Sequence, residues 1–281
     1  MQTCNVFNNY YQALTAAYGA LNFGAPDTSG SDGLSWPNDT VLGSGGFQYL
    51  TFHKYSLGCN PEPLPSAKAV LADPIVPSNP GWSITEFGII CDGGMQGVTD
   101  RLIAATYYLG LAQSASSGGY ASIMPHNVVI PGLWGDGKIR PAYYNQFVVQ
   151  PDGGYAPTPM FYGMYLFSQI VGQTTIGVQT PADFSSVASI TATLGPNGNA
   201  NILVVNINPQ HGFNVRPDQT APWNTANVLV LSGRNCADPS PVLNGQPIGE
   251  GGAWGGSVAS INRGETVFVS SCGAALIEIQ P

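Results

Sequence analysis

Glu86 is the residue in this sequence that is best placed to do chemistry. It lies near the end of a short, mostly apolar segment, Trp82–Gly88, and more glycines follow at positions 93 and 94. Barrel enzymes carry their catalytic groups at the carboxyl ends of buried parallel strands. We therefore interpret Glu86 as a candidate catalytic carboxylate. In the alternative interpretation it only accepts a hydrogen bond from a neighbouring backbone amide.

Few carboxylates compete with Glu86 for this role, because the chain contains only five glutamates. Glu62 lies between two prolines, and Glu250 lies in a glycine-rich loop. Glu265 is expected in a turn, and strand alternation predicts that Glu278 points outward from the last strand. No group of His, Asp and Glu in the sequence has metal-ligand spacing, so we expect neither a metal nor a cofactor.

The elements around Glu86 follow from the spacing of apolar residues. Residues 7–21 have helical spacing, and a loop rich in Gly, Asp, Ser and Pro follows to about residue 46. Residues 47–53 are typical of a buried strand. A proline-rich connection over residues 56–81, with a short turn near 67–71, then leads to the strand at 83–87 that carries Glu86.

Helices and strands alternate after Glu86. Thr99 suits the N-cap of a helix over residues 100–114, which glycines 118 and 119 would end. Residues 120–129 are strand-like, and residues 158–171 predict a second helix with a proline near its start. The alternation from residue 47 to 172 favours a parallel α/β arrangement.

The pattern changes after about residue 180, where short alternating segments replace helical spacing. Turn residues separate six predicted strands: 189–193, 201–207, 227–231, 256–261, 266–270 and 274–279. This pattern predicts an antiparallel β-sandwich of about 95 residues.

Composition limits the classes of function. Only 9% of the residues are charged, and the net charge is −8. Nucleic acids are bound through clustered Lys and Arg, and eight scattered basic residues make no such cluster, so we expect no nucleic-acid partner. No apolar run reaches the roughly 18 residues that a membrane span needs. The high content of Gly and Pro with few charges suggests an extracellular, secretory or lysosomal protein, although the sequence shows no signal peptide.

The five cysteines show no CxxC pairing, which speaks against a zinc or thioredoxin-type site. Cys236 and Cys272 could bridge strands of the C-terminal region, and Cys59 and Cys91 each follow a strand-like segment. The alternative is that all five, including Cys4, are free thiols. The sequence leaves the pairing open.

Four stretches, in their order and spacing, resemble the glycoside hydrolases of the heparanase and β-glucuronidase type, family 79. Residues 51–58 are similar to that family's His-x-Tyr strand end, and residues 84–100 to its nucleophile strand, glycine loop and following helix. Residues 143–172 resemble the segment that leads into its last barrel helix. Residues 244–247 and 271–276 are like its C-terminal β-domain, so the match runs from about residue 8 to the end.

The resemblance implies the C-terminal half of a (β/α)8 barrel, about strands five to eight, over residues 1–178, and a β-sandwich domain over residues 179–281. It also implies a retaining glycosidase that acts on glycans containing glucuronic acid, with Glu86 as nucleophile. Such a nucleophile must be ionised, fixed in position and close to the anomeric carbon.

The resemblance further implies substrate contacts. His53 and Tyr55 would border the same mouth as Glu86, and Tyr55 could donate a hydrogen bond that favours the ionised carboxylate. Gly93 and Gly94 would let backbone N–H groups approach a sugar carboxylate. In the simpler interpretation, His53 is a buried imidazole and Tyr55 is a packed ring. Gly93 and Gly94 then belong to an ordinary flexible loop.

Two further contacts are expected from the same comparison. Tyr144 is the expected contact from the segment before the last barrel helix, with Tyr143 as the alternative. His126 is expected to contact a sugar hydroxyl from the end of barrel strand eight.

The sequence departs from this family at the second catalytic group. The family's acid/base glutamate lies in an Asn-Glu-Pro motif upstream of a helix like residues 7–21, and no Asn-Glu-Pro occurs in this chain. A retaining hydrolase needs two carboxyl groups about 5 to 5.5 Å apart. We therefore expect a truncated chain or fragment with little hydrolytic activity alone.

Three functions remain open at the level of sequence. The first is a β-glucuronidase-like or heparanase-like glycosidase. The second is a retaining barrel glycosidase that acts on neutral sugars. The third is a secreted, non-catalytic glycan-binding protein or pseudoenzyme that kept the cleft without its acid.

Overall fold

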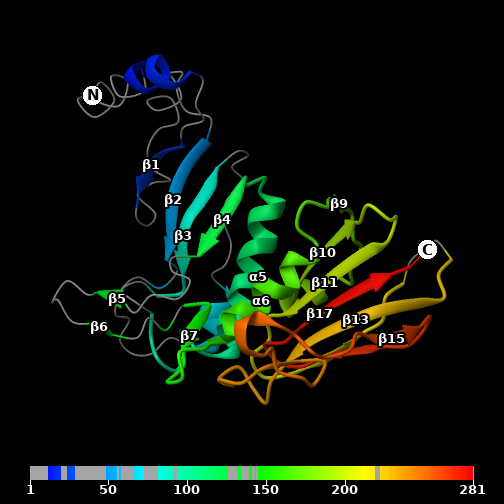
Figure 1. Cartoon of the computed structure of the whole chain (residues 1–281). Helices are drawn as coiled ribbons and strands as arrows, with labels where there is room; N and C mark the ends of the chain where they lie inside the picture. The colour runs from blue at the N-terminus through cyan, green and yellow to red at the C-terminus, as the bar shows by residue number, and fades with distance from the viewer. Residues whose placement is uncertain are drawn as a thin grey trace.

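The sheet that carries Glu86 has four parallel strands (Figure 1). In sheet order they are β1 (Gly24–Thr28), β2 (Tyr49–Tyr55), β3 (Ser83–Gly88) and β4 (Ser122–Pro125). This computed structural model describes residues 12–19, 24–28, 49–55, 57, 66–72, 82–90, 94–125, 132–133, 139–140, 143, 145–218 and 222–280. The parallel α/β arrangement predicted from the alternation is present. That this sheet forms half of a (β/α)8 barrel stays a prediction.

Strand β1 was not expected, because residues 24–28 fall in the segment predicted as a loop. They have the sequence Gly-Ala-Pro-Asp-Thr, in which only Thr28 is of a type that is enriched in strands. Pairing with β2, from Gly24 opposite Tyr49 to Thr28 opposite Phe52, makes them a strand. Here the neighbouring strand overrides local propensity.

Among the described residues, the helices that accompany this sheet include α4 (Ala67–Ala72), α5 (Leu102–Ser117) and α6 (Pro159–Ser168). Residues 12–18 are also helical, within the predicted helix at 7–21, and their Leu14 and Tyr18 are exposed. Figure 1 shows α5 and α6 between the parallel sheet and the antiparallel sheet. Because α5 is covered on both sides, it is apolar almost all round.

The two central helices pack closely. A Cβ atom on Gly163 of α6 would lie 2.7 Å from the carbonyl oxygen of Ala105 on α5, so only glycine allows this approach. Each fully buried leucine on α5, such as Leu109 and Leu111, contributes about 1.5–3 kcal/mol to folding. These contacts fix α5 against both sheets.

The start of α5 differs from the prediction. Thr99 is not its N-cap: the Thr99 hydroxyl instead exchanges hydrogen bonds with the backbone of Met95, and Arg101 occupies the N-cap position. The first helical N–H groups donate to carbonyl oxygens from the C-terminal region, Leu102 to Asp238 at 2.8 Å and Ile103 to Cys236 at 3.0 Å. A tertiary contact therefore supplies the cap that the sequence assigned to a side chain. Gly118 and Gly119 end the helix as predicted.

The C-terminal region contains a seven-stranded antiparallel sheet. Its strands are β9 (Thr174–Ile176), β10 (Ala188–Leu194), β11 (Ala200–Asn206), β13 (Thr225–Ser232), β14 (Val242–Leu243), β15 (Ala259–Asn262) and β17 (Ala274–Ile279). Strand β12 (Phe213–Val215) pairs with β16 (Val267–Val269) in a separate ribbon. All six predicted strands are present, and β9, β12 and β14 are additional. The division at residue 178 stays a prediction, but β9 precedes it in the chain and already pairs with β10.

Alternating residues of β17 serve two cores. Ala274 and Leu276 belong to the core shared with α5 and α6, whereas Ala275 and Ile277 pack with Val267 and other residues on the opposite face. A strand turns successive side chains to opposite faces, so residues 274–277 of β17 are apolar on both faces. This two-sided burial is consistent with the predicted sandwich.

Shorter elements complete the described residues. Strands β5 (Gly132–Leu133) and β6 (Ile139–Arg140) form one ribbon, and β7 (Phe147–Val149) and β8 (Tyr155–Pro157) form another. Single 3-10 turns occur at η1 (Phe184–Ser186) and η2 (Glu250–Gly252). In the part of the chain that is described, no helix is long and apolar enough to span a bilayer.

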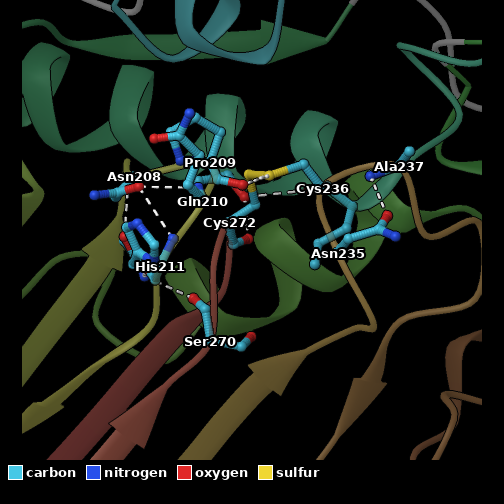
Figure 2. The surroundings of a disulfide bond; sticks show 12 residues. Asn208, Pro209, Gln210, His211, Asn235, Cys236, Ala237, Ser270 and Cys272 are labelled. Carbon is cyan, nitrogen blue, oxygen red and sulfur yellow. Dashed lines mark hydrogen bonds between the residues drawn. A yellow bond between two sulfur atoms is a disulfide. The ribbon is translucent and has the colours of Figure 1, made fainter.

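A disulfide joins Cys236 to Cys272, with 5.2 Å between their Cα atoms (Figure 2). The predicted possibility of a bridge in the C-terminal region is therefore confirmed. Both cysteines also hold α5, because the Cys236 carbonyl accepts from Ile103 and the Cys272 carbonyl accepts from the hydroxyl of Thr106. Cys4, Cys59 and Cys91 lie outside the described residues.

Candidate active site

A β-bulge in β3 places Glu86 beside His53. Phe52 of β2 pairs with Ile84, but His53 pairs with Glu86, so Thr85 is an extra residue. The pairing of β3 with β4 shows the same irregularity between Ile84 and Phe87. Ile84 and Phe87 are buried while Thr85 and Glu86 stay partly open. Bulges commonly re-aim a side chain at functional sites, and this one breaks the alternation around Glu86.

The Glu86 carboxylate lies between two aromatic side chains of β2. The Tyr55 hydroxyl donates a hydrogen bond to Oε1 of Glu86, which is the contact predicted for Tyr55. Nδ1 of His53 lies 3.7 Å from Oε2, and both side chains are 22% exposed. The carboxylate is thus held in position yet remains reachable from solvent. Both are properties that a nucleophile requires.

Gly88 provides the space for the Tyr55 ring. A Cβ atom at position 88 would lie 2.9 Å from Cε1 of Tyr55, closer than real Cβ contacts allow. The Gly88 carbonyl accepts a 3.4 Å hydrogen bond from the hydroxyl of Tyr107, a fully buried residue of α5. The position of Tyr55 therefore depends on the packing of β3 against α5. No role was predicted for Gly88 from the sequence, although it follows Glu86 by only two residues.

The core behind β3 is aromatic. The rings of Phe87 and Tyr108 lie 5.5 Å apart, and Tyr108 also contacts Phe167 of α6 edge-on. Burial raises the pKa of Tyr108 to about 12, so this hydroxyl stays protonated under ordinary conditions. Tyr108 is a structural support for β3, since it packs on the face away from the bulged residues.

The remaining predicted contacts are only partly visible. Gly94 has a φ of 76°, a left-handed conformation that favours glycine. Tyr143, the alternative to Tyr144, is half-buried. Gly93, His126 and Tyr144 lie outside the described residues. The structure thus joins Glu86 to His53 and Tyr55, and the roles of the other positions stay predictions.

One polar residue was missed by the sequence analysis. Gln146 is 2% exposed, and neither its side-chain oxygen nor its nitrogen has a partner among the described residues. The backbone carbonyl of Gln146 accepts a hydrogen bond from the backbone N–H of Thr158, and this bond fixes the loop before α6. Buried amides normally have partners, so this one is a candidate contact for water or a ligand. No spacing pattern in the sequence distinguishes it from other glutamines.

No metal centre is formed by the described residues, among which no group of three or more His, Cys, Asp and Glu side chains could hold an ion. The described site consists of the Glu86 carboxylate, the Tyr55 phenol that donates to it and the His53 imidazole beside it. This set can perform nucleophilic attack, with the phenol controlling the position of the attacking oxygen.

The chain resembles known proteins in structure and not in sequence. Neither a protein-family model nor a curated protein sequence matches the chain. Solved structures do match its fold. The GH51 α-L-arabinofuranosidase from Thermotoga petrophila RKU-1 has a TM-score of 0.65 at 13% identity and covers 99% of this chain. The fold is that of glycoside hydrolases.

Two other structures give the same result. The GH51 arabinofuranosidase from Xanthomonas axonopodis pv. citri has a TM-score of 0.61 at 14% identity over 99% of this chain. The catalytic domain of GH30 xylanase C from Talaromyces cellulolyticus has a TM-score of 0.57 at 10% identity over the whole chain. The match covers 62% of each GH51 enzyme and 57% of the xylanase domain, so this chain spans about three fifths of such proteins. At these identities the likeness establishes the fold, and membership of family 79 stays a prediction.

Proposed function

We propose that this chain carries the nucleophile of a retaining glycoside hydrolase and that Glu86 is this nucleophile. The observation that carries the proposal is the placement of Glu86 at the carboxyl end of β3, held by Tyr55 and flanked by His53. The glycosidase fold supports it independently. Parallel α/β enzymes place their reactive groups at this end of their strands.

The proposed reaction begins with attack by a Glu86 oxygen on the anomeric carbon. The new C–O bond forms while the glycosidic C–O bond breaks, and the leaving alcohol takes a proton from an acid. Water then hydrolyses the glycosyl ester and releases the Glu86 carboxylate. The hydrogen bond from Tyr55 leaves lone pairs of the carboxylate available for attack.

This mechanism also requires a second carboxyl group, which acts as the acid that protonates the leaving alcohol. The sequence contains no Asn-Glu-Pro, the motif that supplies the acid in the family it resembles. We therefore propose that the 281 residues act poorly on substrates with ordinary alcohol leaving groups. Substrates with acidic leaving groups need little protonation and should still react.

The substrate class is proposed from two sources. The resemblance to family 79 favours β-glucuronides, with backbone N–H groups near Gly93 and Gly94 to receive the sugar carboxylate. A second candidate is a neutral pentose substrate, because the similar structures include arabinofuranosidases and a xylanase. The disulfide of Cys236 and Cys272 supports a location in an oxidising compartment.

Covalent trapping of the nucleophile tests this proposal. Dinitrophenyl 2-deoxy-2-fluoro glycosides of glucuronic acid, xylose and arabinofuranose would each be incubated with the full chain. The fluorine slows hydrolysis of the glycosyl ester, and the dinitrophenolate needs no acid. We expect one fluoroglycosyl adduct per chain, located on the peptide that contains Glu86 and absent from Glu86→Gln.

The sugar that labels fastest identifies the substrate class. Labelling by the glucuronide supports the family 79 interpretation, and labelling by a pentoside supports the neutral one. An adduct on another residue, or no adduct with any of the three sugars, would reject Glu86 as nucleophile. An adduct on another residue would make that residue the nucleophile, whereas the absence of any adduct would favour the non-catalytic glycan-binding alternative.

A further inference from the structure

A cavity of about 320 Å³ lies between the end of α6 and the seven-stranded sheet. Glu86, His53 and Tyr55 do not line it. Six side-chain amides and one carboxylate make up just over half of its lining residues, with aliphatic side chains among the rest: Gln169, Gln173, Gly195, Pro196, Asn197, Asn199, Asn201, Asn227, Val228, Leu229, Val258, Leu276 and Glu278. Small-molecule sites have volumes of about 300–1,000 Å³, so the cavity is large enough for a small ligand.

The centre of the cavity is a polar row that crosses three strands. Asn201 of β11 pairs with Glu278 of β17, and Asn227 of β13 pairs with Glu278 from the other side. Directly paired residues of adjacent strands share one face of a sheet. Glu278, predicted to point outward from the last strand, is half-buried on this face and has an amide on each side.

Hydrogen bonds hold the Glu278 carboxylate in place. The side-chain amide of Asn199 donates to Oε1 at 2.7 Å, and that of Asn227 donates to Oε2 at 3.0 Å. Each carboxylate oxygen keeps capacity for a further donor. A site that is fixed before the ligand arrives loses little entropy on binding.

The wall formed by the end of α6 is fixed in the same way. Oε1 of Gln173 accepts from Thr193 at 2.6 Å and from Asn201 at 2.8 Å, and its Nε2 donates to the carbonyl of Gln169 at 2.9 Å. Helix end and sheet are thus joined by side-chain amides and a hydroxyl. The cavity has a polar wall on both sides.

The lining selects the charge of its ligand. Amides and a carboxylate exchange hydrogen bonds with hydroxyl groups, and Leu229, Val258 and Leu276 offer apolar surface to C–H groups. None of the lining residues is Lys, Arg or His, so an anion would meet the negative charge of Glu278 without a cation to offset it. A neutral, polyhydroxylated ligand fits both properties.

We propose that this cavity is a binding site for a neutral saccharide, separate from the site around Glu86. It would hold a glycan chain against the antiparallel sheet and discriminate against uronic acids. The proposal does not rest on the catalytic role of Glu86, because Glu86, His53 and Tyr55 are not among the residues that line the cavity.

Direct binding measurements test the proposal. The full chain carrying Glu86→Gln, which prevents turnover, would be titrated with cellohexaose, with xylohexaose and with a hyaluronan hexasaccharide, by calorimetry and saturation-transfer NMR. Two variants change the cavity, Gln173→Ala at its wall and Asn197→Ala at its exposed rim. Gln210→Ala, an exposed glutamine outside the cavity, is the matched control. Thermal unfolding checks that each variant is folded.

We expect at least one neutral hexasaccharide to bind and the anionic one to bind at least about tenfold more weakly. Gln173→Ala should weaken neutral binding by about tenfold and Asn197→Ala by a few-fold, with no change for Gln210→Ala. Failure of both neutral probes to bind would overturn the proposal. So would binding that both cavity variants leave intact, or variant-sensitive binding of hyaluronan as tight as that of the neutral sugars.

Discussion

The Tyr55 hydroxyl donates a hydrogen bond to the Glu86 carboxylate across the neighbouring parallel strands β2 and β3. The two residues are 31 positions apart in the sequence, and a bulge at Thr85 gives β3 the register that brings them together. This contact turns an isolated carboxylate into one with a defined orientation.

Removal of the Tyr55 hydroxyl should slow the reaction of Glu86. A hydrogen bond to a charged group is worth about 1.5–3 kcal/mol. If it positions the attacking oxygen, Tyr55→Phe should lower the rate constant for covalent labelling by about 10- to 100-fold. Tyr155→Phe, at an exposed tyrosine of β8, should leave that rate unchanged. Equal rates for Tyr55→Phe and the unmodified chain would show that the hydrogen bond does not contribute.

Addition of a methyl group at Gly88 should produce the same defect by displacing the Tyr55 ring. Gly88→Ala places a Cβ where Cε1 of Tyr55 is only 2.9 Å away, so the ring must move. We expect a several-fold slower labelling rate, and the Tyr55→Phe/Gly88→Ala double variant should be no slower than Tyr55→Phe alone. Gly177→Ala, where a Cβ meets open space, is the control. Additive losses in the double variant would mean that Gly88 acts through something other than Tyr55.

Loss of the disulfide should destabilise the chain. Cys236 and Cys272 are 36 positions apart in the sequence. In the entropic model, a cross-link that closes a loop of that size raises the free energy of the unfolded chain by about 4 kcal/mol, because it removes conformational entropy. The Cys236→Ser/Cys272→Ser variant should therefore unfold with a free energy lower by roughly 2–5 kcal/mol in guanidinium chloride. Addition of a reductant should shift the unmodified chain toward the same midpoint. A variant that unfolds at the unmodified midpoint would show that the bridge contributes nothing to stability.

Asp238 should make the free energy of unfolding depend on pH in the acidic range. Burial acts to raise the pKa of this carboxyl, which is 4% exposed, but hydrogen bonds outweigh that effect and lower the pKa below 3.8. The strongest of these come from the backbone N–H of Arg234, at 2.7 Å, and from the Arg234 side chain. Because the folded pKa is the lower one, the stabilisation is present above pH 3.8 and is lost as the pH falls through the folded value.

The corresponding variant is Asp238→Asn. We expect its free energy of unfolding to be lower by about 1–3 kcal/mol at pH 7 and the difference to shrink as the pH falls below 3.8. Urea unfolding at a series of pH values measures this. Asp183→Asn, at an exposed aspartate, should show no such dependence. A difference that stays constant down to pH 3 would contradict the role of the charge.

Several elements could be predicted because their signals are local. The segment at 83–88 is short and apolar and forms β3, and residues 174–280 contain the alternating strands that form the antiparallel sheet. Helix α6 begins at Pro159, after Thr158, as its sequence indicates. The boundaries that were wrong depend on distant contacts. The cap of α5 comes from Asp238 and Cys236, and β1 exists because β2 pairs with it.

The sequence by itself determined the alternation of helices and strands, the change to antiparallel strands and the choice of Glu86 as the candidate carboxylate. These follow from residue type and spacing along the chain, which need no knowledge of neighbours in space. Only the tertiary structure decided that Tyr55 and His53 reach Glu86, that Gly88 makes room for Tyr55, and that Glu278 lies among amides. Each of these depends on strand register and packing between segments tens of residues apart. A shift of one residue in register turns every side chain of a strand to its other face, and the bulge at Thr85 makes such a shift where β2 and β3 pair.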